Sequence, residues 1–140
     1  MSRLRIYCDG GARGNPGPSA CAFVVFDDKH KTVFKKGTYL GGTTNNVAEY
    51  SAVIDALLWL NSYLKDNPNI SYVEFYLDSN LVVNQLLNKF KIKDSKLIIL
   101  SNKIKVLTEN INNIKFDYLY IPRSHNQLAD NLVNYTLDNR

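Results

Sequence analysis

Four carboxylate side chains stand at places where a chain can gather oxygen ligands. Asp9 and Asp78 each end an apolar, strand-like segment, and Glu49 and Asp130 each lie near the start of a helix-like segment. Catalytic groups in open α/β sheets gather at the carboxyl ends of strands. Four carboxylates share a small site only when cations neutralise them, and oxygen-only ligands favour Mg²⁺ or Mn²⁺. The pattern therefore predicts a two-metal site of the kind that supports displacement at phosphorus.

Each of these residues also has a commoner role when taken alone. An Asp at the end of a strand is usually a turn or cap residue, and a Glu in the first turn of a helix usually just suits the helix dipole. The metal-site hypothesis therefore depends on whether the fold brings the four residues together.

Hydrophobic periodicity predicts the strands that must position them. Residues 4–8, 20–26 and 32–40 read as three strands joined by short turns, which implies an antiparallel meander. Residues 72–77 and 116–121 read as two more. If the first and fourth strands are parallel neighbours, Asp9 and Asp78 come together at one edge of the sheet.

The helices follow from a change of period. Apolar residues at helical spacing predict a helix over 50–64 with Asn46 and Glu49 as its capping pair. Three further helices are predicted: 81–87, one from an Asp94 cap to about 111, and one from a Ser124–Gln127 capping pair to about 138. The order is βββαβααβα, an α/β fold.

Composition limits the class of protein. A chain of 140 residues with 45% hydrophobic residues fits one globular domain, so we expect residues 1–140 to be a single domain. No apolar run reaches the length of a membrane span, and the start lacks a signal-peptide pattern, so we expect a cytoplasmic protein. Cys8 and Cys21 are expected to be buried free thiols. The net charge of +4 suits a polyanionic partner.

Four segments in order, YCDGGARGNPGP, TTNNVAEY, FYLDSNLVVNQL and PRSHNQLADNLVN, closely resemble type 1 ribonuclease H. They are most similar to its compact archaeal and reverse-transcriptase-like branch, which lacks a basic protrusion. The resemblance runs from about residue 3 to 137. It implies the ribonuclease H-like fold, a five-stranded mixed sheet whose first three strands are antiparallel, flanked by helices. It also implies that the metal-binding, catalytic residues are Asp9, Glu49, Asp78 and Asp130.

The same resemblance suggests substrate contacts, residue by residue. Asn15 and Thr44 match positions that hold a phosphate of the DNA strand. Backbone amides of Gly10 and Gly11 match a site that reads the RNA 2′-hydroxyl. The positions that match contacts to bases or ribose near the cut are Asn45, Asn46 and Asn80.

The chain also departs from the longer members of this family. In place of a basic insertion it has only NKFKIKDSK, whose Lys89, Lys91 and Lys93 are candidates to hold the substrate. The family's mobile histidine lies about ten residues before the last Asp, whereas His125 lies five before Asp130. Five helical residues turn roughly 140° away from a shared face, so the spacing argues against a catalytic role for His125. Arg123 and His125 remain auxiliary candidates.

The activity that the resemblance implies is endonucleolytic hydrolysis of the RNA strand of an RNA–DNA hybrid. Two Mg²⁺ ions, replaceable by Mn²⁺, would leave 5′-phosphate and 3′-hydroxyl ends. Double-stranded RNA and RNA–DNA junctions are further candidate substrates, and a monomer without a membrane partner is expected. Three alternatives are weighed against it: a non-catalytic nucleic-acid-binding module on the same fold, a nucleotide-binding α/β protein, and a domain cut from a reverse transcriptase. All four carboxylates are present, and neither GxGxxG nor GxxxxGK[ST] occurs.

Overall fold

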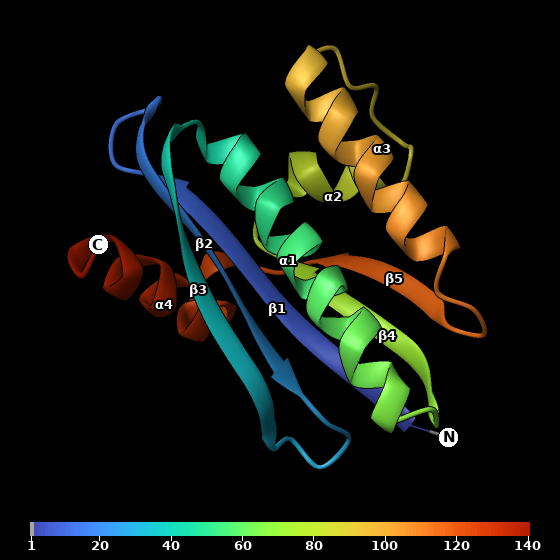
Figure 1. Cartoon of the computed structure of the whole chain (residues 1–140). Coiled ribbons are helices and arrows are strands. Elements are labelled where there is room, and N and C mark those ends of the chain that lie inside the picture. The colour runs from blue at the N-terminus through green and yellow to red at the C-terminus, as the bar shows by residue number, and fades with distance from the viewer. Residues whose placement is uncertain (1) are drawn as a thin grey trace.

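A computed structural model describes residues 2–140 and places five strands in one mixed sheet, in the order β3-β2-β1-β4-β5 (Figure 1). β1 (Ser2–Ala12) pairs antiparallel with β2 (Gly17–Phe26), which pairs antiparallel with β3 (Thr32–Thr43). On its other side β1 pairs in parallel with β4 (Ile70–Leu77), and β4 pairs in parallel with β5 (Lys115–Tyr120). The predicted mixed sheet is confirmed, and β1 and β4 end at the same edge.

Helices cover both faces of this sheet (Figure 1). α1 (Asn45–Asp66) packs on β1 and β2, and α3 (Ser95–Glu109) packs against α1. α2 (Asn80–Leu86) follows β4 directly, while α4 (Gln127–Asp138) lies across β1, β2 and β3 on the opposite face. The observed order βββαβααβα confirms the prediction.

The two faces of the sheet bury cores of different size. Strand alternation points Leu4, Ile6 and Cys8 of β1 toward α1, where they join the large core. On the α4 side a smaller cluster packs the helix against β2; its buried members are Ala20, Ala22, Val133 and Leu137. Cys8 and Cys21 are buried free thiols, as expected.

Thr44 caps α1, so the predicted Asn46–Glu49 capping pair is wrong. Thr44 has an extended backbone (φ −100°, ψ 162°), and its hydroxyl accepts a hydrogen bond from the Val47 amide at 3.2 Å. Asn46 already lies inside the helix. The helix therefore begins earlier than the apolar periodicity indicated, and Glu49 has no role in capping it.

The start of α4 also differs from the prediction. Ser124 lies in a short 3-10 turn (Arg123–His125), and the capping position is Asn126, whose side chain makes no capping hydrogen bond. The predicted Ser124–Gln127 pair is therefore wrong. The prediction that Asp94 caps α3 is confirmed, because its Oδ1 accepts from the Lys96 and Leu97 amides.

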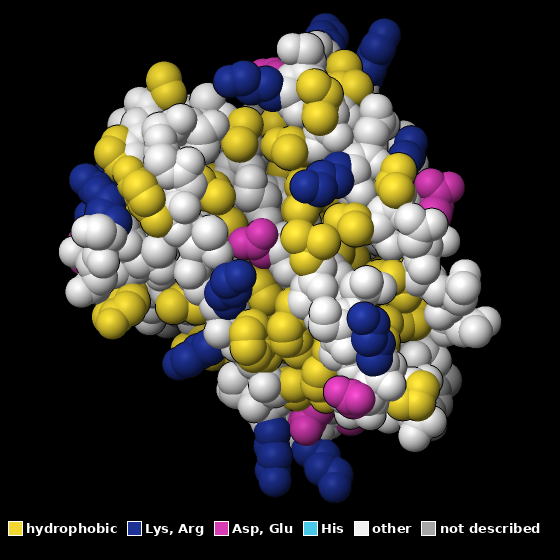
Figure 2. All heavy atoms as spheres, in the orientation of Figure 1, with side chains coloured by type: hydrophobic (Ala, Val, Ile, Leu, Met, Phe, Trp, Pro, Cys, Tyr) yellow, Lys and Arg dark blue, Asp and Glu magenta, His cyan; other side chains and the backbone are white. Residues whose placement is uncertain are grey.

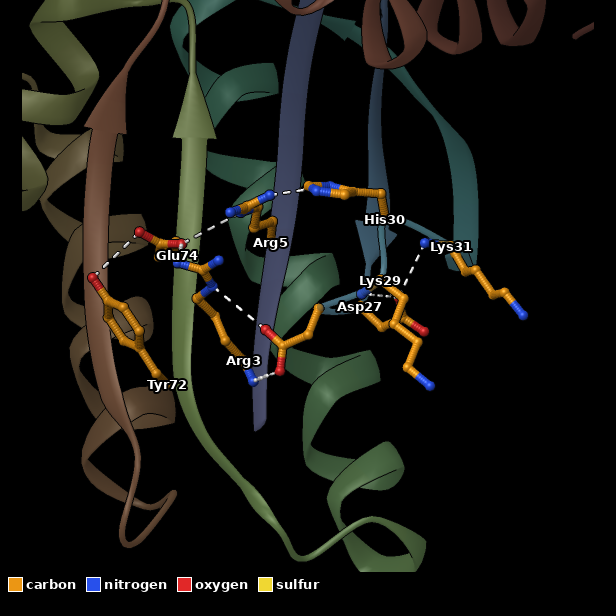
Figure 3. Close-up of polar contacts among 9 residues, drawn as sticks. Arg3, Arg5, Asp27, Lys29, His30, Lys31, Tyr72 and Glu74 are labelled. Carbon is orange, nitrogen blue, oxygen red and sulfur yellow. Dashed lines mark hydrogen bonds and ion pairs between the residues drawn. The ribbon is translucent and has the colours of Figure 1, made fainter. Parts of the chain in front are cut away.

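The face of the sheet on which α4 packs also carries paired charges, beyond the end of that helix (Figure 3). Arg3 lies 3.6 Å from Asp28 and 3.4 Å from Glu74, and Arg5 lies 3.7 Å from Glu74. Arg5 also donates a hydrogen bond to Nδ1 of His30 at 3.2 Å. This network ties the β2–β3 hairpin to β1 and β4.

Within residues 2–140, no helix combines the length and the apolar character that crossing a bilayer requires.

Candidate active site

Three of the four predicted carboxylates converge at one edge of the sheet. Asp9, Glu49 and Asp78 each offer an oxygen atom, and these atoms all lie within 4.8 Å of one another. The parallel pairing of β1 with β4 brings Asp9 and Asp78 together, since both strands end there. Glu49 comes from the first turns of α1, which starts at the same edge.

Gly10 allows α1 to approach β1 closely enough for this convergence. A Cβ atom at Gly10 would overlap the backbone of Ala48 and the amide nitrogen of Glu49. Only glycine therefore fits between Asp9 and the helix that supplies Glu49. Gly11 differs, because a Cβ there would make only ordinary contact with Val133 at 3.9 Å.

Asp130 lies in the first turn of α4 and lines the same pocket as the other three carboxylates. It does not join the mutual 4.8 Å grouping of Asp9, Glu49 and Asp78. Its negative charge nonetheless acts on the cluster, because it is one of the charges that raise the pKa of Asp9. The fourth carboxylate thus comes from the helix on the opposite face of the sheet from α1.

Burial and mutual repulsion make this cluster electrostatically unfavourable without a cation. Desolvation, followed by the negative charge of Asp78, raises the pKa of Asp9 to about 7. Desolvation and then the charge of Asp9 raise the pKa of Glu49 well above its usual range. Both shifts favour the protonated form of the carboxyl, which relieves part of the repulsion when no cation is bound.

The donor set fits a hard divalent cation. All candidate ligand atoms are carboxylate oxygens, which Mg²⁺ and Mn²⁺ prefer. Oε2 of Glu49 is buried, and within residues 2–140 it has no hydrogen-bond partner. A buried acceptor without a partner is costly, and a cation at the cluster would satisfy it.

The raised pKa values predict how the metal-free protein responds to pH. Asp titrates at about pH 3.9 in an unfolded chain, whereas Asp9 titrates at about pH 7 in the folded one. The folded state therefore binds more protons in between, so stability should fall as the pH rises from 4 to 8. We expect the melting temperature without metal to drop by on the order of 5 °C or more between pH 5 and pH 8.

Two comparisons test whether the raised pKa of Asp9 causes this loss of stability. Saturating Mg²⁺ at pH 8 should restore most of the lost melting temperature, because the cation replaces the proton. Asp9→Asn should flatten the pH dependence, since it removes one titrating group. A wild-type melting temperature that rises steadily from pH 5 to pH 8 without metal would contradict the raised pKa values.

The candidate substrate residues near the cluster form a hydrogen-bonded frame. Oδ1 of Asn45 accepts from the Ala12 amide at 2.8 Å, and Oδ1 of Asn15 accepts from the Asn45 amide at 3.0 Å. These bonds hold the Gly-rich β1–β2 turn against the start of α1, next to Thr44. Asn45 and Asn46 line the carboxylate pocket.

The remaining substrate candidates lie further along the chain. Asn80 is the first residue of α2, and its carbonyl and side-chain oxygens accept hydrogen bonds from the Asn84 amide group. Lys89, Lys91 and Lys105 line a groove between the end of α2 and α3. Lys93 is exposed beside it. Figure 2 shows Lys and Arg side chains interspersed with hydrophobic ones over the end of the molecule that carries these helices.

The two auxiliary candidates separate in the structure. Arg123 lines the carboxylate pocket. His125 lines a different pocket, together with Arg5, Tyr7 and His30. The helical-spacing argument for His125 started from a wrong premise, because His125 belongs to the 3-10 turn and not to α4. His125 lines no part of the carboxylate pocket.

His125→Ala should therefore cost little activity. The side chain is exposed and lines no part of the carboxylate pocket, so we expect turnover to fall by less than about tenfold. Steady-state cleavage of a labelled RNA–DNA hybrid, the substrate that the family resemblance implies, measures this, with Asp130→Asn assayed in parallel. A loss as severe as that of Asp130→Asn would mean that the turn moves the ring into the site.

Several residues at the pocket escaped the sequence reasoning. Arg13 lines the pocket and pairs with Asp138 at 2.7 Å, and Asn134 lines it from α4. Asn126 contacts Asp78 directly. Position within the quoted segments was the only available signal, because an Arg in a turn or an Asn at the start of a helix has many ordinary roles.

A mixed five-stranded sheet with carboxylates gathered where β1 and β4 end defines a protein of the ribonuclease H-like fold. The chain belongs to the RNase H family, whose model matches residues 1–137.

Relatives and solved structures agree with this assignment. LC11-RNase H1, isolated from compost by metagenomics, is 40% identical, with a TM-score of 0.91 over 99% of this chain and 98% of that one. RNase H1 of Halobacterium salinarum is 32% identical, with a TM-score of 0.89 over 99% of each chain. A bifunctional protein of Mycobacterium tuberculosis is 35% identical over 97% of this chain. The chain spans only 36% of the length of that mycobacterial relative.

Proposed function

We propose that the protein is an endoribonuclease that hydrolyses the RNA strand of RNA–DNA hybrids with two Mg²⁺ ions. The observation that carries the proposal is the convergence of Asp9, Glu49 and Asp78, with a buried Glu49 oxygen that no protein group satisfies within residues 2–140. The solved complex of LC11-RNase H1 with an RNA/DNA hybrid, 39% identical to this chain, supports the choice of substrate. Residues 1–140 would form one catalytic domain, and the cytoplasmic, monomeric state stays a prediction.

The four carboxylates would hold the cations, with Asp130 contributing from α4. Cations held there would lower the pKa of a water and stabilise the charge of the leaving 3′-oxygen, and the products would carry 5′-phosphate and 3′-hydroxyl ends. The protein would hold these carboxylates in place at the ends of β1 and β4 and near the starts of α1 and α4. Because the pKa values of Asp9 and Glu49 are raised, protons would compete with cations for these carboxylates, so cation occupancy should increase with pH.

Substrate recognition would depend on shape and backbone without reading base sequence. The frame of Asn15, Thr44 and Asn45 would contact the DNA strand and nearby sugars, with Asn46 and Asn80 alongside. The amides of Gly10 and Gly11 would face the RNA 2′-hydroxyl. Arg123 lines the pocket and would contact a phosphate near the cut.

The function is tested with four labelled substrates: an RNA–DNA hybrid, duplex RNA, duplex DNA and an RNA–DNA junction. We expect cleavage of the RNA strand of the hybrid, with 5′-phosphate products on a sequencing gel. Binding of the hybrid without cleavage, in Mg²⁺ and in Mn²⁺, would instead identify a non-catalytic binding module.

The lysines after α2 should provide much of the hybrid-binding field. Residues 89–105 carry six Lys and one Asp, a local net charge of +5 in a chain of net charge +4. Lysines on phosphates act through counterion release, so their removal weakens binding and its salt dependence together. Changing Lys89, Lys91, Lys93 and Lys96 to Ala should raise KM by about tenfold or more and lower the salt slope. The turnover number should change little.

A matched control removes the same charge elsewhere. The control uses four lysines of the β2–β3 turn and of β3: Lys29, Lys31, Lys35 and Lys36. None of them lines the carboxylate pocket. Their combined change to Ala should leave KM closer to the wild-type value at each of two salt concentrations. Equal effects of the two quadruple variants would mean that only the total charge matters.

A further inference from the structure

We propose that Asn126 is a positioning residue that sets the orientation of the Asp78 carboxylate for cation binding. The inference rests on the proposed function, because it concerns the same carboxylate cluster. Asn126 lies between the 3-10 turn and α4, and its side chain is almost fully buried, with 1% of the residue exposed.

A single amide nitrogen of Asn126 joins two of the strands that form the site. Nδ2 donates to Oδ2 of Asp78 at 3.0 Å and to the backbone carbonyl of Cys8 at 2.8 Å. Cys8 directly precedes Asp9, so the second bond anchors the amide to the strand end that carries the first carboxylate. Both hydrogens of the amide group are used, which fixes the rotation of the side chain.

The orientation of this amide follows from the chemistry of its neighbours. A flipped side chain would set Oδ1 against a carboxylate oxygen and a carbonyl oxygen, which are both acceptors. Only the nitrogen can face them. Oδ1 is consequently left buried, and within the described residues 2–140 it has no hydrogen-bond partner. A polar residue kept at this cost is present for its donors.

The backbone of Asn126 reaches the fourth carboxylate as well. Its carbonyl accepts a hydrogen bond from the amide of Asp130 at 3.1 Å, as the first bond of α4. The side chain of Asn126 makes no helix cap, because its amide is engaged with Asp78 and Cys8. One residue thus connects the end of β1, the carboxylate after β4 and the start of α4. Partners of metal ligands act in this way, by orienting the ligand for the ion.

The inference is tested by cation binding as well as by activity. Titration calorimetry with Mn²⁺ should give a dissociation constant for Asn126→Ala that is roughly 10-fold to 100-fold higher than for the wild type. The turnover number should fall by a similar factor. KM for the hybrid should change by less than about threefold, because Asn126 contacts the metal-binding carboxylate of Asp78 and not the substrate. Gln127→Ala, at the next and exposed position, is the matched control and should behave as wild type in both measurements.

A double-mutant cycle distinguishes positioning from a general structural role. In an Asp78→Asn background, the Asn126→Ala change should have little further effect on Mn²⁺ affinity, because the carboxylate it orients is gone. Wild-type affinity in Asn126→Ala, or an equally large loss in the Asp78→Asn background, would overturn the inference. If Asn126→Ala does not fold, Asn126→Leu, of similar volume and without donors, takes its place in the same cycle. The binding measurement also separates this result from a failure of the proposed function, since it needs no substrate.

Discussion

Asp9→Asn should abolish cleavage of the hybrid while making the metal-free protein more stable at pH 8. Asp9 offers an oxygen within 4.8 Å of those of Glu49 and Asp78, and a neutral amide is a poor ligand for a hard cation. We expect turnover to fall by about 100-fold or more. The same change removes a buried carboxyl group. Burial and the negative charge of Asp78 raise the pKa of that group to about 7. The melting temperature without metal should therefore rise.

The control for this variant makes the same chemical change away from the site. Asp94 caps α3, and Asn is an equally good cap residue, so Asp94→Asn should keep both activity and melting temperature. Turnover and thermal unfolding are measured on all three proteins with and without Mg²⁺. If Asp9→Asn kept more than a tenth of wild-type turnover, Asp9 would not be a metal ligand.

Removal of divalent cations should have an effect as large as loss of a carboxylate. Excess EDTA should reduce cleavage to background, and added Mg²⁺ or Mn²⁺ should restore it, because the grouped ligand atoms of Asp9, Glu49 and Asp78 are all carboxylate oxygens. Ca²⁺ should bind, and so raise the melting temperature, yet support little turnover, since its coordination is looser. Undiminished cleavage in excess EDTA would rule out a metal-dependent mechanism.

The sheet was predictable because apolar periodicity and short turns leave few topologies. The antiparallel meander followed from that pattern, whereas the parallel β1–β4 pair was only the condition under which Asp9 and Asp78 would meet, and the mixed sheet came from the family resemblance. Helix starts were less predictable. Thr44 and Asn46 are both good cap residues, and which one caps α1 depends on how closely the helix approaches Gly10. That approach is a tertiary contact with no local sequence signal.

The site was predicted to a similar extent. The carboxylates could be found because their contexts resemble a known family, but the spacing of Asp130 from the other three depends on how α4 packs. Asn126 was missed because an amide beside a helix start is ordinarily a cap. Its contact with Asp78 joins positions 48 residues apart in the chain. Only the folded structure shows that the side-chain amide of Asn126 donates to the carboxylate of Asp78.

The small cluster beneath α4 has a consequence for how the molecule responds to heat. The buried members of the cluster between α4 and β2 are Ala20, Ala22, Val133 and Leu137, whereas the large core lies on the other face of the sheet. Segments with few buried apolar contacts open at lower free energy than the whole protein. Sub-global opening of α4 would carry Asp130 and Asn126 away from a sheet that stays folded. Loss of the proposed activity would then precede global melting, because α4 would open at a lower temperature than the sheet.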